Sequence, residues 1–575
     1  MPKVKKSDDA STGRASQNPA SRTRQPARRT TAAAPSSPNT RLGARTEFRI
    51  YPSIGIARVG NSKDSFIIGP EAPGVVATGP FRDASAEKRL KPQAARFRIY
   101  KVDIDENENE RVVEEVVAGE SVKIGWSVSL ANRKAAGLRI FDTLRRKPKP
   151  MARNDGLDRK KLVISASGSV AGSKKLGPVL SGAIEFAKPN TKGVTVTDIE
   201  LATLRTDDVG RLLVVGGPGK SGSPTKAPVK SFADNDGWYD SVSDGPVSAN
   251  LQIRGQDISV VPAWVVITVP RYAPGTYGVV TWFDQAVSMA RTDETGIDRP
   301  RTTSFTQDIY PILKRADNLS GVHRPVHANG APPLSDAARI ASFSKKEARA
   351  AVLSRLTPVG TDANNFEELP PGMPQLYSGA NADPGEPTFT FLSLTKYQMA
   401  HIENWVRGNF DDDWPGAPPA STPFEKIPVA RQAWALSQAA LEACVGGPFF
   451  PGIEGTYDIA RMDTYHPEPH LRREFRINPA HPAGFLTEKM ALPWQADFTD
   501  CRGFWWPSQR PDDVATKNSA QPQKWDRMIV GSDGDRHLHP YLNMVAFWSK
   551  LGFVVFDEGT GKFVEDERTL GTETS

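Results

Sequence analysis

Apolar and polar residues alternate with a period of two in several stretches between Phe48 and about residue 300. Such alternation predicts β-strands that turn one face toward a core. Glycine, proline and aspartate residues separate the stretches, as expected for turns between mainly antiparallel strands. No repeat period is evident, which argues against a propeller. The predicted strands cover residues 96–105, 110–118, 121–132, 192–204, 211–217 and 263–269.

After residue 300 the apolar positions recur every three or four residues, which predicts helices. In the first of these, Pro311 must kink the helix or lie in its first turn. Thr395 is placed to cap the third helix and Gly408 to stop it, and Gly446 and Gly447 are expected to end the fourth. The predicted helices cover residues 304–319, 335–356, 395–410 and 430–445, and residues 543–557 are interpreted as a helix followed by a strand.

Together these patterns predict an α+β fold, with a β-rich, mainly antiparallel N-terminal half and a helix- and loop-rich C-terminal half. At 575 residues the chain is too long for one compact core, so two domains or one large elaborated domain are expected. We divide it into a basic tail (residues 1–46), a β-rich domain (47–300) and a helix- and loop-rich domain (301–575). The composition of the tail, mostly Ser, Thr, Ala, Pro, Arg and Lys, predicts disorder.

The formal net charge of +7 comes from the tail. Residues 1–45 contain ten basic and two acidic side chains, so the other 530 residues carry 63 basic and 64 acidic ones. A nucleic-acid-binding body would show its own basic excess, which is missing here. No apolar stretch approaches the roughly 18 residues of a membrane span, and the basic start lacks the apolar region of a Sec signal peptide. We therefore expect no nucleic-acid or membrane partner, and a cytoplasmic protein or one exported without a Sec signal.

The two cysteines are too few for a disulfide framework, and they take different interpretations. Cys444 is expected to be a buried apolar filler, the usual role of such a thiol. Cys501 lies in LPWQADFTDCRGFWWPSQRPD (492–512), a segment with three tryptophans. Its neighbours Asp497 and Asp500 would raise the pKa of a thiol, which disfavours a papain-like nucleophile. The arrangement is compatible with a carboxylate that accepts a proton while another agent oxidises the site.

The histidines offer an alternative, a metal-dependent enzyme. His466 and His470 are four residues apart, as in a zinc-binding helix, but the two prolines in this stretch prevent that helix. His537 and His539 would face the same side of a strand, where a metal would still need distant ligands. Metal analysis of the purified protein would separate this alternative from the others.

Two glycine-rich segments, GGPGKSG (216–222) and GGPFFPGIEG (446–455), invite comparison with phosphate-binding loops. Neither matches GxxxxGKS/T, and neither is a GxGxxG that follows a strand. We interpret both as tight backbone turns, and no nucleotide-binding fold is predicted.

Eight motifs spread over nearly the whole chain carry a resemblance to a known family: YPSIGIARVGNS (51–62), QAARFRIY (93–100), LRTDDVGRLLVVGG (204–217), NDGWYDSVSDGPV (235–247), TQDIYPIL (306–313), GGPFFPGIE (446–454), MALPWQADFTDC (490–501) and WSKLGFV (548–554). With them the chain resembles the lysine ε-oxidase/glycine oxidase family of quinoproteins. The cofactor of that family is cysteine tryptophylquinone, which is made from the protein's own side chains. Together the motifs are highly specific, and only the tail lies outside the resemblance.

The resemblance assigns roles by position. Cys501 resembles the cross-linked cysteine of the family, Trp548 the tryptophan that becomes the quinone, and Asp497 the aspartate required to build the cofactor. Joining sulfur to an indole and inserting two oxygens removes protons from weak acids, so a carboxylate base must lie against both partners. Three further indoles compete with Trp548, and the first two are expected to form stacking walls beside the site: Trp505, Trp506 and Trp525.

The resemblance further implies an amino-acid or primary-amine oxidase that acts on a CH–NH2 group with O2 as acceptor. Its products would be an aldehyde or oxo acid, ammonia and hydrogen peroxide. His537 is the candidate for substrate-side acid/base chemistry, because histidine titrates near neutral pH, and Asp497 is the alternative. The family pattern also implies a separate flavoprotein partner that installs the oxygens. A non-catalytic member of the same family stays open, as do the substrate and whether the chain forms a homo-oligomer.

Overall fold

In the computed structural model of the chain, one compact unit begins at Ala44. The structure describes residues 44–140, 142, 149–293, 296–323, 334–359, 373, 376–380, 389–446, 452–455, 457–500, 506–517, 519–530 and 539–571. The division of the chain near residue 300 stays an interpretation of the sequence. Among the described residues, no helix is long and apolar enough to cross a membrane.

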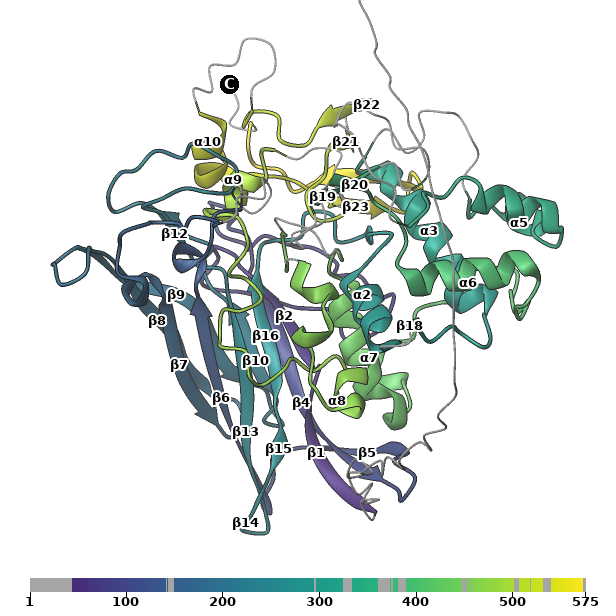
Figure 1. The fold of residues 1–575 in the computed structure, drawn as a ribbon, viewed down its shortest axis with the longest axis horizontal. Helices are drawn as coiled ribbons and strands as arrows, with labels where there is room; N and C mark the ends of the chain where they lie inside the picture. Colours follow the sequence, from purple (N-terminus) through teal and green to yellow (C-terminus); the bar gives the residue numbers. More distant parts are fainter. Residues whose placement is uncertain are drawn as a thin grey trace, which may run out of the picture. The chain divides into compact units, whose positions relative to one another are not determined.

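A 14-stranded sheet dominates the N-terminal half (Figure 1). Its main path follows the order β7-β6-β13-β16-β2-β4-β10-β9-β8. Along this path only β16 and β2 pair in parallel, which confirms the mainly antiparallel arrangement. The strands of the path are β2 (Ile54–Arg58), β4 (Gln93–Ile104), β6 (Val122–Asn132), β7 (Ile164–Ala171), β8 (Leu176–Phe186), β9 (Val194–Thr206), β10 (Leu212–Gly216), β13 (Ser243–Ile253) and β16 (Ala263–Thr268).

Shorter pieces complete the β structure. The side strands of the large sheet are β1 (Arg45–Tyr51), β3 (Ile67–Ile68), β5 (Glu110–Val116), β14 (Gln256–Ile258) and β15 (Val260–Val261). Three two-stranded ribbons are β11 (Ser221–Gly222) with β12 (Tyr239–Asp240), β17 (Thr292–Asp293) with β18 (Gly296–Ile297), and β19 (Tyr377–Ala380) with β20 (Phe389–Phe391).

The large sheet curls until its two end strands, β7 and β8, contact each other. A glycine permits the contact, because a Cβ on Gly168 would lie only 2.6 Å from Cδ2 of Leu180. Phe97, Val214 and Val265 on the central strands have no exposed surface. The curled sheet therefore encloses much of the apolar core.

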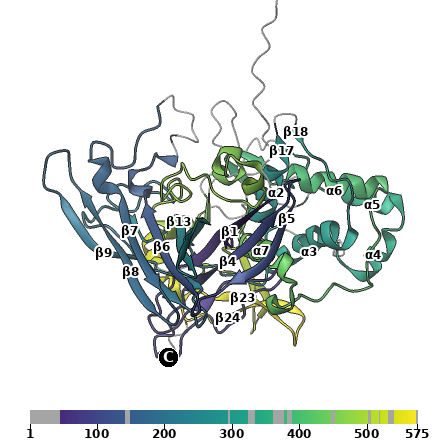
Figure 2. The same cartoon turned by 90° about the horizontal axis from the view of Figure 1, so that it is seen from below.

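Helices from the second half lie beside the sheet (Figure 2), and α7 packs against β2 and β5. The α+β class predicted from the sequence is confirmed. The helices are α2 (Trp282–Ala290), α3 (Tyr310–Asn318), α4 (Ala337–Ser342), α5 (Lys346–Leu353), α6 (Lys396–Arg407), α7 (Val429–Glu442) and α8 (Pro469–Arg473).

Two of the predicted helix starts agree with the structure. The π-helical turn Phe305–Ile309 leads into α3, and Pro311 lies in the first turn of α3, where its missing N–H is not needed. Helix α6 begins with a capping box in which the Thr395 hydroxyl accepts from the backbone N–H of Gln398. It ends at Gly408, whose φ of 87° is left-handed.

Two predicted helices differ from the structure. The single helix expected over residues 335–356 is wrong, because α4 and α5 are separated at Phe343. The break lets the Phe343 ring pack edge to face on Trp405, with centroids 5.0 Å apart. The helix expected to end at Gly446 ends at Glu442 instead. Gly446 packs on another segment, since a Cβ there would lie 2.1 Å from the Thr281 backbone.

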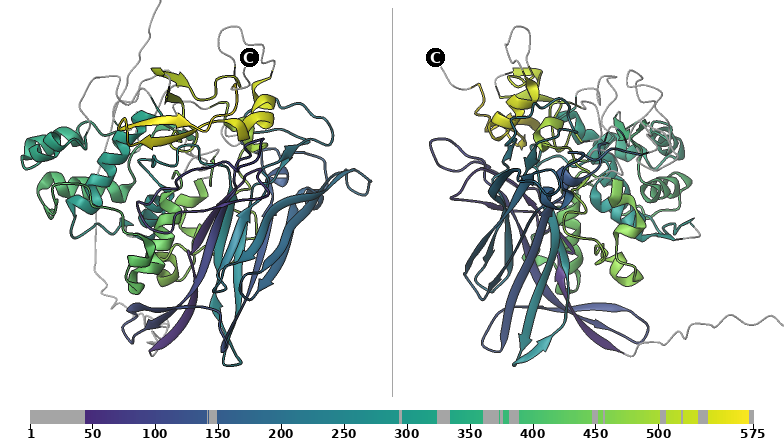
Figure 3. Two further views of the ribbon diagram at one scale, coloured as in Figure 1. Left: turned by 180° about the vertical axis from the view of Figure 1, so that it is seen from behind. Right: turned by 60° about the vertical axis from the view of Figure 1, so that its left-hand side comes forward.

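The C-terminal segment lies across one end of the large sheet (yellow in Figures 1 and 3). As predicted, a helix and then a strand follow each other within residues 543–557. This region contains α9 (Trp494–Asp497), α10 (Pro540–Phe547) and a four-stranded sheet of β21 (Asp513–Thr516), β22 (Ser519–Lys524), β23 (Phe553–Asp557) and β24 (Lys562–Asp566).

Candidate active site

Two short helices, α9 and α10, bring the predicted cofactor segments together. They pack against each other, as Figure 1 shows. Asp500 follows α9 and immediately precedes Cys501, and its carboxylate accepts a hydrogen bond of 2.6 Å from the Tyr541 hydroxyl on α10. Trp548 follows the last residue of α10. The chain on either side of this contact therefore leads to Cys501 on one side and to Trp548 on the other.

Trp548 is held among aromatic rings. Its side chain is nearly buried, and its ring packs edge to face with Trp494 of α9, at a centroid separation of 5.2 Å and an interplanar angle of 70°. Trp494 in turn packs on Phe498 at 5.2 Å. The Tyr272 hydroxyl donates a hydrogen bond of 2.5 Å to the Trp548 carbonyl oxygen. Both the ring and the backbone of Trp548 are fixed.

Asp497 ends α9 with a buried carboxyl group that is only 2% exposed. Among the described residues, its Oδ1 has no hydrogen-bond partner. Burial raises the pKa of Asp497 well above its ordinary value, and the nearby Asp500 charge raises it further. Arg510 and Lys134 oppose this pKa shift more weakly. The site therefore contains a carboxyl group with one oxygen unpaired among the described residues, and it holds its proton more tightly than an exposed aspartate does.

A buried ion pair supports α9 from the sheet side. The Lys134 ammonium and the Asp240 carboxylate are 2.5 Å apart and have no exposed surface. Asp240 also accepts a hydrogen bond of 3.0 Å from the Trp494 backbone N–H, so the pair fixes the start of α9. Burial lowers the pKa of Lys134, and the Asp240 charge opposes this.

The glycine-rich segment 216–222 lies against the Trp548 ring. A Cβ on Gly219 would lie 2.7 Å from Cζ2 and 2.9 Å from Cη2 of that ring. Gln495 of α9, which has no exposed surface, donates to the Gly219 carbonyl at 3.1 Å. Its amide oxygen accepts from the Ser221 hydroxyl at 2.6 Å. The segment is a tight turn, as predicted, and α9 holds it against the indole.

Three predicted site residues, Cys501, Trp505 and His537, lie outside the described residues. The structure brings the segments of Asp497 and Trp548 together through the packing of α9 on α10 and of Trp494 on Trp548. Their roles, and that of Cys501, stay predictions.

The other competing indoles are buried. Trp506 is 1% exposed and Trp525 has no exposed surface. The Trp525 indole N–H donates to the Gly552 carbonyl at 2.9 Å, and its ring centroid lies 4.8 Å from that of Tyr272. Trp525 therefore belongs to the aromatic packing behind Trp548, on the side of Tyr272.

The histidines do not share a helix. α8 begins at Pro469, so His470 is helical and His466 precedes the helix, as its prolines predict. His539 directly precedes α10 in an extended conformation. Among the described residues, which do not include His537 or Cys501, no group of three or more His, Cys, Asp or Glu side chains could hold a metal ion.

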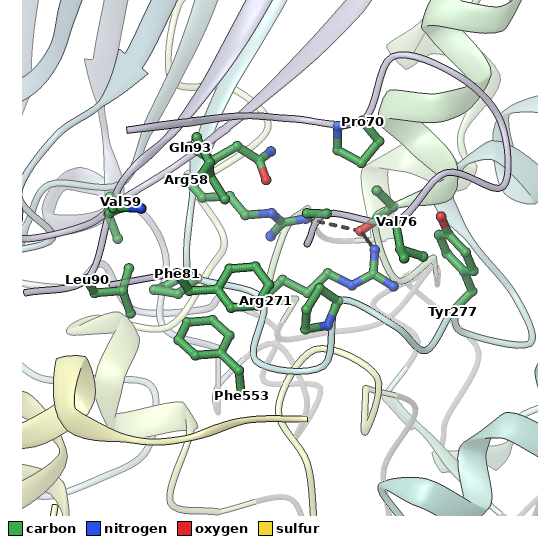
Figure 4. A pocket seen from close by; sticks show the side chains of 16 residues that line it. Arg58, Val59, Pro70, Val76, Phe81, Leu90, Gln93, Arg271, Tyr277 and Phe553 are labelled. Atoms are coloured by element: carbon green, nitrogen blue, oxygen red, sulfur yellow. Dashed lines mark hydrogen bonds between the residues drawn. The ribbon is translucent and has the colours of Figure 1, made fainter. Parts of the chain in front are cut away.

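A small cavity of about 30 Å³ lies between Arg58, Arg271 and Phe553 (Figure 4), with room for a water molecule or two. The guanidinium groups of Arg58 and Arg271 both donate to the Ala443 carbonyl at its wall. Neither Trp548 nor Asp497 lines this cavity. At this volume the cavity is too small for an amino acid.

Cys444 packs next to this arginine pair. Its thiol is 1% exposed and accepts a weak hydrogen bond of 3.7 Å from Arg58, which also pairs with Glu454 at 2.5 Å. Burial raises the pKa of the Cys444 thiol, and the Glu454 charge adds to this. A buried protonated thiol is the filler that the sequence predicts.

The sequence did not predict a role in the site for several of its residues. Trp494 and Gln495 stand in the quoted cysteine–tryptophan segment, but their contacts could not be read from it. Gly219 belongs to a motif that was recognised only as a turn. Asp240 lies within one of the family motifs, whereas Lys134 gave no signal, because only the fold buries it beside Asp240.

Comparisons with known proteins place the chain in a class. Residues 51–267 match the family described as L-lysine epsilon oxidase N-terminal, and residues 375–525 match the L-lysine epsilon oxidase C-terminal domain. The chain therefore belongs to the L-lysine epsilon-oxidase family.

Particular relatives come from Marinomonas mediterranea. The chain is 23% identical to L-lysine 6-oxidase over 679 residues, an alignment that covers 90% of this chain and 89% of the relative. The crystal structure of the Schiff base intermediate of L-Lys epsilon-oxidase with L-Lys matches at a TM-score of 0.67 and 20% identity, covering 91% of this chain and 95% of that one. A second structure of the L-Lys epsilon-oxidase matches at 0.65 and 20% identity, covering 91% and 94%. At this identity the structures show a shared fold.

Proposed function

We propose that the chain is a quinoprotein oxidase of amino acids or related primary amines, with cysteine tryptophylquinone built from Cys501 and Trp548. The family membership and the similarity to a protein named L-lysine 6-oxidase support an amino-acid oxidase. The observation that carries the proposal is Asp497, a buried carboxyl group with an unpaired oxygen on the helix that packs against the Trp548 segment.

The residues present fit the construction of such a cofactor. A carboxylate with a raised pKa is a stronger base than an exposed one, which suits the removal of protons from a thiol and from indole carbons. Trp494 packs on the Trp548 ring and Phe498 packs on Trp494, so apolar rings lie on this side of the site. This surface excludes water and holds the indole plane.

The covalent steps balance with dioxygen and a flavoprotein partner. The cross-link replaces the Cys501 S–H and one ring C–H of Trp548 by one S–C bond, and releases two protons and two electrons. Replacing two ring C–H groups by carbonyls adds two oxygens and removes two further hydrogens. Dioxygen, activated by the flavoprotein, supplies the oxygen atoms and accepts the electrons, and Asp497 accepts protons locally.

When present, the quinone supplies an electrophilic carbonyl that a primary amine can attack, a task that unmodified side chains perform poorly. Overall, the substrate carbon loses one hydrogen and the nitrogen another, as two protons and two electrons. Dioxygen takes up these two protons and two electrons to give hydrogen peroxide. Water then hydrolyses the product imine, which releases ammonia and leaves an aldehyde or oxo acid.

The protein's own task in turnover is to move the proton of the amine-bearing carbon. His537 is our candidate for this base, because an imidazole titrates near neutral pH. Asp497 is the alternative once the cofactor has formed. Asp500 and Tyr541 keep the segments that carry Cys501 and Trp548 together during either step.

The test is co-production with the flavoprotein partner, followed by assay of hydrogen peroxide and ammonia against L-amino acids and primary amines. We expect equal amounts of both products for at least one substrate, and none from Asp497→Asn prepared in the same way. A mature, modified chain that releases no peroxide from any of these amines contradicts an oxidase.

A further inference from the structure

We propose that Gly219 is a positioning residue, which leaves the space that the substituents on the Trp548 ring require. The inference deepens the proposed function and rests on it. It also gives a purpose to the glycine-rich segment 216–222, for which the sequence indicated only a turn.

The shortest contacts involve two adjacent carbons of the indole. A Cβ on residue 219 would lie 2.7 Å from Cζ2 and 2.9 Å from Cη2, the two carbons of the six-membered ring nearest to it. Both distances are shorter than an ordinary contact between carbon atoms, about 3.5–4.0 Å. Even the unmodified ring therefore leaves no room for a side chain here.

The modified ring needs more space than the unmodified one. The six-membered ring of an indole has four C–H positions, and an ortho-quinone on this ring takes two adjacent ones. When the thioether is on the same ring, three of the four positions carry substituents, so at least one of Cζ2 and Cη2 must carry one. A carbonyl oxygen lies about 1.2 Å beyond its carbon, so a substituted carbon needs more room than a C–H does, next to a residue that already lies close to it.

The turn is held in place from two sides. Gln495 binds the carbonyl of Gly219 and the hydroxyl of Ser221, and it is two residues before Asp497 on α9. β11 pairs with β12, where Ser221 lies opposite Asp240, the partner of Lys134. The helix that carries the proton acceptor and the turn that bounds the ring are thus fixed to each other.

The backbone conformation supplies a matched control. Gly219 has a φ of +70° and Gly255 one of +81°, so alanine is strained at both positions. A Cβ on Gly255 would meet nothing within 4 Å, whereas one on Gly219 meets the Trp548 ring and, at 3.0 Å, Cγ2 of Val59. Comparing Gly219→Ala with Gly255→Ala therefore separates the side-chain contacts at residue 219, of which the two with the Trp548 ring are the shortest, from backbone strain.

The experiment produces wild type and both variants with the flavoprotein partner, and measures intact mass and thermal unfolding. We expect Gly255→Ala to reach the wild-type fraction of oxygenated chain, and Gly219→Ala to reach about tenfold less while still folding, because overpacking opposes the modified ring. An equal oxygenated fraction in Gly219→Ala and wild type overturns the inference. A wild-type chain without added oxygen overturns the proposed function itself, and the inference with it.

A second variant decides the matter if Gly219→Ala does not fold. Gln495→Met keeps a long side chain and adds no atom beside the ring, but it loses both hydrogen bonds to the turn. We expect a folded chain in which the oxygenated fraction, measured by intact mass, falls. Its activity should fall in proportion to that fraction. Full oxygenation of Gln495→Met shows that the two Gln495 hydrogen bonds do not position the turn beside the ring, and overturns the inference.

Discussion

Trp494 and Trp548 pack edge to face with ring centroids 5.2 Å apart, although 53 positions separate them in the sequence and α9 holds one while α10 leads to the other. Trp494 is 2% exposed. We expect Trp494→Ala to lower the free energy of unfolding by about 3–5 kcal/mol, because it removes a buried aromatic ring. Denaturant unfolding of the unmodified chain measures this.

The control for this change is Trp434→Ala. Trp434 is 47% exposed, so its removal should lower stability clearly less. If both variants lowered the free energy of unfolding equally, the Trp494–Trp548 contact would not stabilise the fold more than an exposed tryptophan does.

Asp497→Asn should change how stability depends on pH. Burial raises the pKa of Asp497 in the folded chain above the unfolded value of about 3.9. The folded wild type therefore retains a proton that the unfolded chain releases, and its stability falls as the pH rises from about 3.9 through the folded pKa. Asparagine does not titrate, so Asp497→Asn should gain stability relative to wild type over this range.

The measurement compares melting temperatures of the two unmodified chains, made without the flavoprotein, between pH 4 and 8. The difference should be smallest near pH 4 and should grow toward pH 8 in favour of Asp497→Asn. A relative stability of the variant that falls with rising pH is incompatible with a raised pKa at Asp497.

Lys134→Met should be strongly destabilising. It leaves the Asp240 carboxylate buried without its cation, at a loss of about 3–5 kcal/mol. Lys161→Met is the matched control, since Lys161 pairs with Glu185 at 3.2 Å on the surface and such pairs contribute about 0–1 kcal/mol. Chemical unfolding of both variants checks the difference, and similar losses would mean that the Lys134–Asp240 pair does not anchor α9.

The two cysteines should behave differently. Cys444→Ser replaces a buried thiol by a hydroxyl, so it should lower stability and leave the visible absorption of the mature protein in place. Cys501→Ser should abolish that absorption and turnover. The absorption spectrum and the melting temperature of each variant check this, and a Cys501→Ser protein with full chromophore and activity excludes our assignment.

The sequence predicted the elements with strong local signals. Thr395 and Gly408 marked the ends of α6, and the alternation in residues 96–105 gave most of β4. Strands β7, β8 and β13 were missed, because serine, glycine and proline weaken their apolar pattern, as in SDGPVSANLQI. Their stability comes from pairing within the sheet, which local reasoning does not see.

The candidate site was predictable only as a set of residues. The family motifs identified Asp497 and Trp548, whereas the contacts of Trp494, Gln495 and Gly219 join positions more than fifty or even three hundred residues apart. Such contacts depend on the tertiary fold. The unpaired oxygen of Asp497 likewise became visible only with its surroundings.

Mass spectrometry tests the central claim most directly, on intact protein purified after co-production with the flavoprotein and then on its peptides. A Cys501–Trp548 thioether and an ortho-quinone together should add roughly 28 Da to the translated chain. Peptides that hold these two residues should remain joined after reduction, which a disulfide would not survive. A free Cys501 in active protein, or its linkage to Trp505, Trp506 or Trp525, would contradict the assignment to Trp548.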